Sequence, residues 1–353
     1  MKPYYQDDLK PPFPYFGGKR NAAPIVWDAL GDVGGYVEPF AGSAAVLLRR
    51  PPFEGRRVET INDSDGWLIN AWRAIQHDPA TVAREAFGPV SEVDYHARLA
   101  WLNERRDDDL IAWLEGDPLA YDPVSAAWWL YVTACAIGAP FSGGPWRVID
   151  GRLTNTSALS EGVSTGISKE LPHLGNAGQG IHRALPHLGD AGKGIHRALP
   201  HLGDAGQGAL EAYLGRLQAR LARVRITAGD WRRVVKPSVI RATAGNSEIG
   251  VFLDPPYETS SDLYAAGKEA EGISAEAREW AKNADPELRI VIAGYNDEHN
   301  NLLDHGWTVT AGKAGGGAGY NKDGDAGKRE SLWMSPSCLN PHEMLDLWGG
   351  GAA

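Results

Sequence analysis

The segment Phe252–Tyr257, FLDPPY, holds the residues best suited to chemistry: an apolar run that ends abruptly in Asp254, Pro255, Pro256 and Tyr257. Ligands of open α/β sheets bind beyond the carboxyl ends of the strands, so such a strand end is a candidate site. The two prolines fix φ and remove two backbone donors, which leaves a carboxylate, a rigidly presented carbonyl and an aromatic ring close together. This set suits a planar base that carries an amino group.

An aromatic amine such as N6 of adenine is a poor nucleophile, because its lone pair is delocalised into the ring. If the Asp254 carboxylate and the Pro255 carbonyl each accept one amine hydrogen, the nitrogen is drawn towards tetrahedral geometry and its lone pair points at an electrophilic methyl group. Tyr257 would then stack on a base extruded from the duplex. A sulfonium leaving group carries its own positive charge, so no metal is required. A plain strand-ending turn is the alternative, since Asp-Pro and Pro-Pro are common turn formers.

Short motifs nearer the N-terminus could hold a nucleotide-like cofactor. Residues 14–19 read PYFGGK, and residues 36–44 read YVEPFAGSA, in which small residues allow the backbone to approach a ligand closely. Asp63 ends a predicted strand, where an acidic side chain is suited to hold ribose hydroxyls. Each motif alone also fits an ordinary Pro/Gly loop, so the evidence lies in their order along the chain.

Taken together, these motifs resemble those of the Dam-like, D12-class family of adenine-N6 DNA methyltransferases. The resemblance implies that Asp254, Pro255, Pro256 and Tyr257 are catalytic and that the cofactor is S-adenosyl-L-methionine. It implies a cofactor-binding set of Tyr15, Gly17, Gly18, Lys19, Glu38, Pro39, Phe40, Gly42, Asp63, Asp230, Trp231 and Asp254.

Within this set, the resemblance gives several residues a role. Glu38 is expected to hold the charged end of the cofactor and Asp63 its ribose. Asp230 could accept a hydrogen bond from the cofactor's adenine while Trp231 packs beside it, although an ordinary turn before a core Trp fits the same residues. The resemblance covers residues 13–76 and 225–338, and it assigns the strand-like segments 290–299 and 329–338 to the scaffold.

Two other functions stay open at this point. N4 of cytosine is also an aromatic amine, and DPPY rather than a serine-led variant favours adenine by family resemblance only. A catalytically silent DNA-binding module could keep the same fold, but such a module would have no chemical reason to keep Lys19, Glu38, Asp63, Asp254 and Tyr257 together.

Alternating strand and helix patterns predict an α/β fold. Strands are expected at 36–38, 57–61, 225–227, 250–253, 289–292, 307–310 and 331–334, and helices at 43–49, 65–75, 210–221 and 275–282. By resemblance this is a class I, Rossmann-like methyltransferase fold with a mostly parallel sheet. The catalytic domain is expected in two parts, 1–78 and 223–340, followed by a tail at 341–353.

Between the two parts lies a segment of mainly helical pattern, residues 79–222, which takes the position of a target-recognition region. Helical breaks are expected near Gly88, at 107–109 and at 116–118, and the Gly-rich stretch 141–170 suggests a surface loop. Because this middle part matches the family by position only, it predicts no target sequence.

A 14-residue repeat occupies residues 172–206, with His173, His187 and His201 in equivalent places. Its glycines and prolines argue against a regular helix throughout any unit. The repeats and the following basic helix predict a DNA-contacting set of Arg183, Arg197, Arg216, Arg220 and Arg223. A dispensable surface insertion is the alternative, and zinc binding is disfavoured because the histidine spacing fits no ordinary ligand pattern, so no metal is expected.

The net charge of −10 argues against a protein that coats nucleic acid by charge alone. Residues 171–240, however, hold ten Lys/Arg against four Asp/Glu, a local charge of +6, so the rest of the chain carries −16. This segregation is compatible with a local basic face for double-stranded DNA, or with ordinary surface variation. It identifies neither a cognate restriction endonuclease nor an oligomeric state.

Cysteine content and hydropathy predict an intracellular protein. Only Cys135 and Cys338 are present, and the N-terminus lacks the charged-then-apolar pattern of a signal peptide. Even the apolar stretch 125–140 is shorter than the roughly 18 to 20 residues needed to span a bilayer, so no membrane contact is expected. The short repeats and the C-terminal resemblance favour a phage- or prophage-encoded protein in the bacterial cytoplasm.

Overall fold

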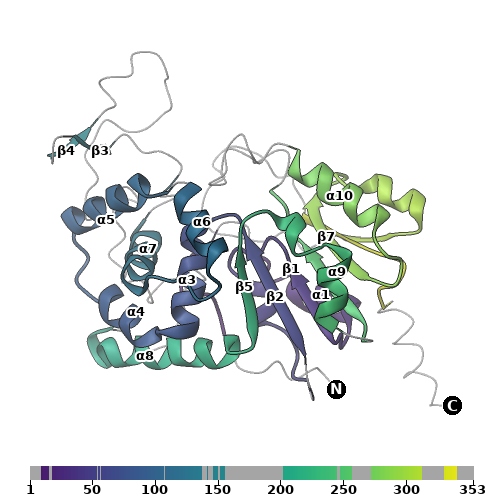
Figure 1. Cartoon of the computed structure of the whole chain (residues 1–353), viewed down its shortest axis with the longest axis horizontal. Coiled ribbons are helices and arrows are strands. Elements are labelled where there is room, and N and C mark those ends of the chain that lie inside the picture. Colours follow the sequence, from purple (N-terminus) through teal and green to yellow (C-terminus); the bar gives the residue numbers. More distant parts are fainter. Residues whose placement is uncertain are drawn as a thin grey trace.

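The computed structural model of the 353-residue chain describes residues 9–15, 18–53, 55, 57–106, 108–136, 141, 146–149, 152–155, 202–244, 247–256, 272–311 and 330–339. Figure 1 shows a twisted sheet with helices on both faces and a helical lobe beside its β5 edge. The predicted catalytic residue Tyr257 and the predicted cofactor-binding residue Gly17 lie outside the described ranges, as do the predicted DNA-contacting residues Arg183 and Arg197.

The described residues form one seven-stranded sheet in the order β5-β2-β1-β6-β7-β9-β8. Its strands are β1 (Gly35–Glu38), β2 (Val58–Asp63), β5 (Val224–Ala228), β6 (Ile249–Leu253), β7 (Arg289–Tyr295), β8 (Thr308–Ala311) and β9 (Glu330–Met334). The first five in this order are parallel, whereas β9 runs antiparallel to β7 and β8. The expected α/β class with a mostly parallel sheet is confirmed, and the arrangement is compatible with a Rossmann-like fold.

The strand order reverses direction between β1 and β6. From β1 the chain passes to β2 and β5 on one side, and later returns to fill β6 and β7 on the other. In doubly wound sheets, ligands bind outside the carboxyl ends of the strands at this reversal. The topology therefore places Glu38, the last residue of β1, and Asp254, the first residue after β6, where a ligand site is expected.

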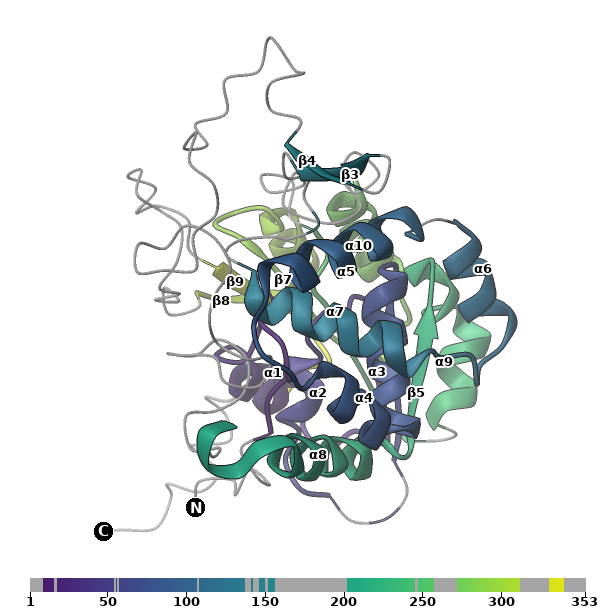
Figure 2. The same cartoon turned by 90° about the vertical axis from the view of Figure 1, so that its left-hand side faces the viewer.

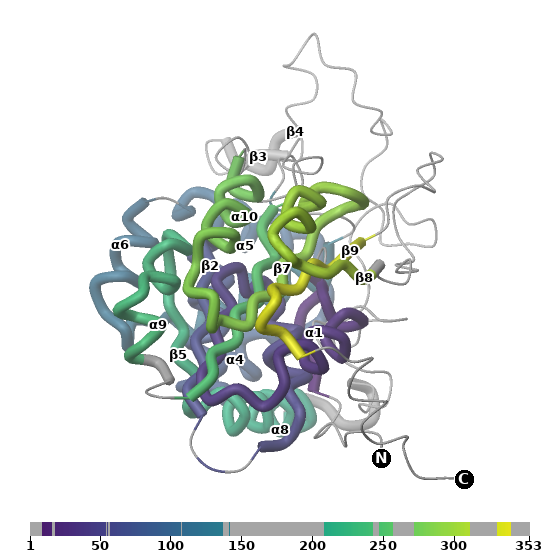
Figure 3. Tube along the Cα trace, turned by 90° about the vertical axis from the view of Figure 1, so that its right-hand side faces the viewer, coloured from purple at the N-terminus to yellow at the C-terminus, as the bar shows by residue number. Residues whose placement is uncertain are grey.

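The central strands are buried on both faces, as parallel strands between helices must be. On one face, Phe252 and Val291 pack with α1 (Ala23–Leu30) and α3 (Gly66–His77) in the larger hydrophobic cluster. On the other, their neighbours Val251 and Ile290 pack with α9 (Pro237–Ala244) and α10 (Ile273–Asn283). Figure 3 views the molecule from the side opposite the helical lobe, with α10 near β7 and the β9 and β8 edge.

The helical lobe consists of α4 (Pro79–Ala86), α5 (Glu92–Glu104), α6 (Asp108–Gly116), α7 (Pro123–Cys135) and α8 (Leu202–Leu221), packed around α3. Figure 2 shows α5 and α7 towards the viewer, with α8 running below α4. Side-chain caps begin several of these helices: Asp65, Asp78 and Asp122 accept hydrogen bonds from the first backbone N–H groups of α3, α4 and α7. The lobe belongs to the same hydrophobic cluster as the α3 side of the sheet, so it is built onto the sheet without a separate core.

Among the described residues, the remaining elements are the short α2 (Ala45–Leu48), the 3-10 helices η1 (Trp231–Arg233) and η4 (Asn300–His305), and an antiparallel pair, β3 (Trp146–Ile149) with β4 (Arg152–Asn155). The expectation of a plain loop across 141–170 is wrong at this pair. Its sequence signal is a two-residue Asp-Gly between WRVI and RLTN, a common hairpin turn. Helices α1 and α9 also went unpredicted.

Helix α8 begins at Leu202, within the third repeat unit. From Leu202 onwards this unit is helical, so its glycines do not prevent a helix there. The prediction that no unit is a regular helix throughout is not tested, because residues 172–201 lie outside the described ranges. Packing of the later part of α8 against α3 and α4 offsets the weak helix propensity of its first turns. Among the helices that the structure describes, none is long and apolar enough to cross a membrane.

Candidate active site

Four acidic side chains gather at the carboxyl edge of the parallel strands. Glu38 ends β1, Asp63 ends β2 and Asp254 follows β6, as the sequence predicted. Glu330 is the fourth: β9 is antiparallel, so its first residue pairs with Tyr295, the last residue of β7, at that same edge. Glu330 belongs to a segment that the sequence assigned to the scaffold, and no motif marks it.

Lys19 joins the N-terminal motif to the DPP segment. Its Nζ lies 2.9 Å from Asp254 Oδ2 and 2.9 Å from Glu330 Oε1. The Lys19 side chain is only 3% exposed, against 17% for Asp254 and 32% for Glu330. The Lys19 carbonyl accepts the backbone N–H groups of Ala22 and Ala23, so the start of α1 fixes the residue that carries this ammonium. Residues far apart in sequence thus meet at one ion cluster around a buried ammonium group.

Glu38 is buried beside this cluster and is held by Tyr36, whose hydroxyl donates a 3.0 Å hydrogen bond to Glu38 Oε2. Burial raises the pKa of Glu38 from 4.5 to about 8; the Tyr36 hydrogen bond opposes the rise, and the nearby Asp254 carboxylate adds to it. At neutral pH the carboxyl group is therefore mostly protonated in the protein alone. A cation that bound beside it would favour the ionised form and release the proton.

Gly42 lies in the loop after β1 and has a φ of +47°, in the left-handed region. A Cβ atom there would lie 2.6 Å from the ring of Tyr15, so only glycine lets the N-terminal motif lie over this loop. The Gly42 N–H donates to Asp63 Oδ2 at 2.9 Å, and its carbonyl accepts from the Trp72 indole at 3.0 Å. A Cβ atom added at Gly18 would lie 3.4 Å from the Ser43 hydroxyl oxygen, so the two predicted cofactor motifs lie side by side.

Asp63 is oriented by backbone donors. Its Oδ2 accepts from Gly42 and its Oδ1 accepts from the Asp65 N–H, each at 2.9 Å. Burial raises the pKa of Asp63 to about 6, and these backbone hydrogen bonds oppose the rise. The carboxylate is therefore ionised at neutral pH, and each oxygen keeps acceptor capacity for a hydroxyl group.

Asn62, which the sequence did not single out, ties the ends of three strands. Its amide donates to the carbonyls of Pro39 at 3.2 Å and Gly229 at 2.9 Å, and it accepts from Thr227 at 3.0 Å. The two carbonyls belong to the loops that carry Phe40 and Trp231, whose ring centroids lie 5.4 Å apart. An asparagine at the end of a predicted strand carries no distinctive sequence signal, so the role of Asn62 became visible only in three dimensions.

Trp231 is buried, and its indole N–H has no hydrogen-bond partner within the described ranges. The neighbouring Asp230 is exposed and caps η1: it accepts from the Arg232 N–H at 2.8 Å and pairs with the Arg232 guanidinium at 3.0 Å. Arg232 also pairs with Glu276. An adenine contact by Asp230 stays a prediction, and its carboxylate is already engaged.

The predicted DNA-contacting arginines on α8 divide into two kinds. Arg216 lies exposed along the helix, and Arg223 lies exposed just after it. Arg220 is turned inward: it pairs with the buried Glu59 at 2.7 Å and donates to the Leu47 carbonyl at 2.9 Å. A DNA contact by Arg220 would have to break this pair, so the geometry gives Arg220 a structural role.

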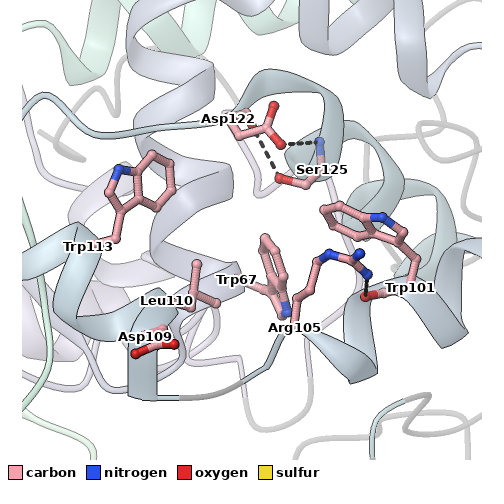
Figure 4. Close-up of a pocket in the computed structure, with 8 residues that line it drawn as sticks. All are labelled: Trp67, Trp101, Arg105, Asp109, Leu110, Trp113, Asp122 and Ser125. Carbon is pink, nitrogen blue, oxygen red and sulfur yellow. Dashed lines mark hydrogen bonds between the residues drawn. The ribbon is translucent and has the colours of Figure 1, made fainter.

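A cavity of about 360 Å³ lies within the helical lobe, apart from the acidic edge. Figure 4 shows Trp113 on one side of it and Trp67 with Trp101 on the other, with Asp122 and Ser125 of the α7 start above. The Arg105 guanidinium stacks 4.3 Å from the centre of the Trp101 ring. None of the residues that line this cavity was a predicted site residue, although all of them except Trp67 belong to the predicted recognition region 79–222.

A scan against protein-family models finds no matching family, and a search among curated proteins finds no significant match. Within the part of the chain that the structure describes, no group of three or more His, Cys, Asp or Glu side chains is placed to hold a metal ion.

Proposed function

We propose that this chain is a class I methyltransferase that transfers a methyl group from S-adenosyl-L-methionine to N6 of adenine in double-stranded DNA. One observation carries the proposal: Lys19, Glu38, Asp63 and Asp254, from four distant segments, meet at the ligand-binding edge of one sheet. They are the residue types that the proposed cofactor and target base require, in the places where the doubly wound topology puts ligands.

The acidic residues fit this cofactor by charge and hydrogen bonding. A buried Glu38 suits an ammonium group, and Asp63, aligned by two backbone donors, suits the two hydroxyls of a ribose. At Gly42 a Cβ would meet the Tyr15 ring, so the absence of a side chain keeps the loop after β1 close to the N-terminal motif that would share the cofactor. When bound, S-adenosylmethionine would supply a methyl group on a positively charged sulfur. As the methyl carbon bonded to N6, the carbon–sulfur bond would break with its electron pair staying on sulfur, and the proton lost from N6 would pass to the Asp254 carboxylate or to water.

The chain's own contribution is to orient the amine. Asp254 and the buried Pro255 stand directly after β6, so β6 fixes the Asp254 carboxylate and the Pro255 carbonyl relative to each other. If both accept hydrogens of the target amine, its lone pair is directed away from the base plane. Preorganised acceptors of this kind contribute more in a water-poor site than in bulk solvent.

Exposed cations near the lobe support DNA as the substrate. Arg216 and Arg223 are exposed in the segment whose local charge is +6. Such a basic segment can contact phosphates although the whole chain is acidic. The base sequence to be read is not implied by these contacts, because phosphate contacts carry no sequence information.

The test is to incubate the purified chain with methyl-labelled S-adenosylmethionine and unmethylated plasmid DNA, digest the DNA, and identify the labelled nucleoside. We expect N6-methyladenine. Label on N4 of cytosine would show that cytosine, the alternative target, is the substrate instead of adenine. Cofactor binding without label would favour a silent module or another acceptor, and absence of cofactor binding would overturn the proposal.

A further inference from the structure

We infer that Glu330 is a positioning residue that retains the Lys19 ammonium while Asp254 accepts the target amine. The inference rests on the proposed methyl transfer. It concerns a side chain that no motif marks and that enters the site because β9 runs opposite to its neighbours.

The starting point is that Lys19 is nearly fully buried yet contacts two carboxylates equally, at 2.9 Å each. A buried ammonium needs a partner, because an unpaired charge in a water-poor site costs several kcal/mol. The Lys19 contact also engages Asp254 Oδ2, an oxygen of the carboxylate that the target amine must reach. With Asp254 as its sole carboxylate, Lys19 would compete directly with the amine.

Glu330 removes this competition. It is the more exposed of the two carboxylates, and its backbone is fixed because β9 pairs with β7 from Tyr295↔Glu330 onwards. The Lys19 ammonium can therefore stay paired with Glu330 while its ion pair with Asp254 weakens. The ammonium stays paired throughout, so the Asp254 carboxylate becomes a better acceptor without leaving a buried charge alone.

A purely structural role predicts something different. If Glu330 only neutralised Lys19, its loss would lower stability and depress activity by the same factor at every pH. In our account, removing the Glu330 charge tightens the Lys19–Asp254 pair and also lowers the pKa of Lys19 relative to the parent protein, because an anion that favours the charged ammonium is gone. Raising the pH then deprotonates Lys19 and frees Asp254.

The experiment compares the parent protein with Glu330→Gln in methyl transfer to unmethylated plasmid DNA from pH 7 to pH 10. We expect Glu330→Gln to lower kcat by about 10- to 100-fold at pH 7, with little change in KM for the cofactor, and to recover most of that loss at the alkaline end. Glu330→Asp, which keeps the charge, should fall between the two. Glu287→Gln, at an exposed glutamate just before β7, is the matched control.

Near-parent activity of Glu330→Gln at pH 7, or a loss that is equal at every pH, overturns the inference. Thermal unfolding and cofactor titration of each variant identify a folding failure; if Glu330→Gln does not fold, the pH profile of Glu330→Asp is decisive, and a profile parallel to the parent's overturns the inference. A parent protein that transfers no methyl group rejects the proposed function itself, which separates the two failures.

Discussion

The acidic edge of the sheet and the helical lobe both bury charged side chains, but they do so to different ends. In the lobe, Arg73 is buried, and its Nε and Nη1 groups donate to the carbonyls of Ile226, Leu114, Asp117 and Ala120, which holds α3, α6 and β5 together. At the edge, Glu38 and Asp63 keep acceptor capacity beyond their internal contacts. Buried charge therefore marks a candidate site only where capacity is left over for a ligand.

The largest effect should come from substituting Asp254, the carboxylate at the acidic edge that we propose accepts the target amine. We expect Asp254→Ala to lower methyl transfer by about a thousandfold, because the target amine loses its charged acceptor, while Lys19 keeps Glu330 as a partner and the fold persists. Labelled transfer to plasmid DNA and thermal unfolding check both points. Asp304→Ala, at an exposed aspartate in η4, should leave both unchanged; near-parent activity of Asp254→Ala would contradict the account.

The Glu38→Gln variant should separate ligand binding from stability. We expect cofactor affinity to fall by about 10- to 100-fold, the size of one hydrogen bond to a charged group. Calorimetry at pH 7 in buffers of different ionisation enthalpy should show about one proton released when cofactor binds the parent protein, since the pKa of Glu38 is about 8 without ligand. The variant should release none. Equal proton release by both proteins would be inconsistent with Glu38 at the cofactor's ammonium.

The same residue makes stability depend on pH. Because the pKa of Glu38 is raised from 4.5 to about 8, the folded protein holds a proton that the unfolded chain releases, so stability from this group is full below about pH 4.5 and is lost as pH rises through 8. The loss is at most about 5 kcal/mol. Denaturant titrations should show a flatter pH dependence for Glu38→Gln than for the parent between pH 5 and 8.

Much of the sheet could be predicted because its strands are short apolar runs with clear ends. The predicted strand at 250–253 corresponds to β6 (Ile249–Leu253), and that at 331–334 to β9. What the pattern could not give was direction: nothing in ESLWM indicates an antiparallel strand, so Glu330 could not be placed at the ligand edge. Asn62 was missed for a similar reason, because its partners Pro39 and Gly229 are brought together only by the fold.

The lobe was less predictable because its signals compete. The spacing of Leu210 and Leu217 predicted the apolar stripe of α8. Arg220 on the neighbouring stripe was predicted to contact DNA, but in the structure it pairs with Glu59. A helical pattern shows which side chains share a face without showing what packs against it. The repeat glycines likewise suggested turns, and tertiary packing of α8 overrode that local preference.

A pair of substitutions on α8 sharpens the contrast between structural and ligand-facing charge. Arg220→Ala should lower the free energy of unfolding by about 2 to 4 kcal/mol, because Glu59 is buried and loses one of the two charged partners that it has among the described residues, Arg220 and Arg50. Arg216→Ala should change stability by less than about 0.5 kcal/mol and reduce the salt dependence of DNA binding by about one ion. Denaturant unfolding and DNA titration across salt concentrations check both; the reverse pattern would restore Arg220 as a DNA contact.

The smallest effect is expected from the repeats. A deletion should end before Leu202, where α8 begins, and should therefore remove residues 172–201. We expect DNA affinity to fall by about tenfold or less and its salt dependence to flatten, because Arg183 and Arg197 are removed. An unchanged salt dependence would assign the repeats to a dispensable insertion.

Adenine-N6 methylation of DNA can be measured in methylation-deficient bacteria that express the chain. Their DNA would be sequenced by a method that reports N6-methyladenine at single-base resolution. The account predicts methylated adenine within one discrete sequence motif, and its loss when Asp254→Asn replaces the parent protein. DNA that carries no N6-methyladenine, although the parent protein is present in the soluble fraction, would contradict it.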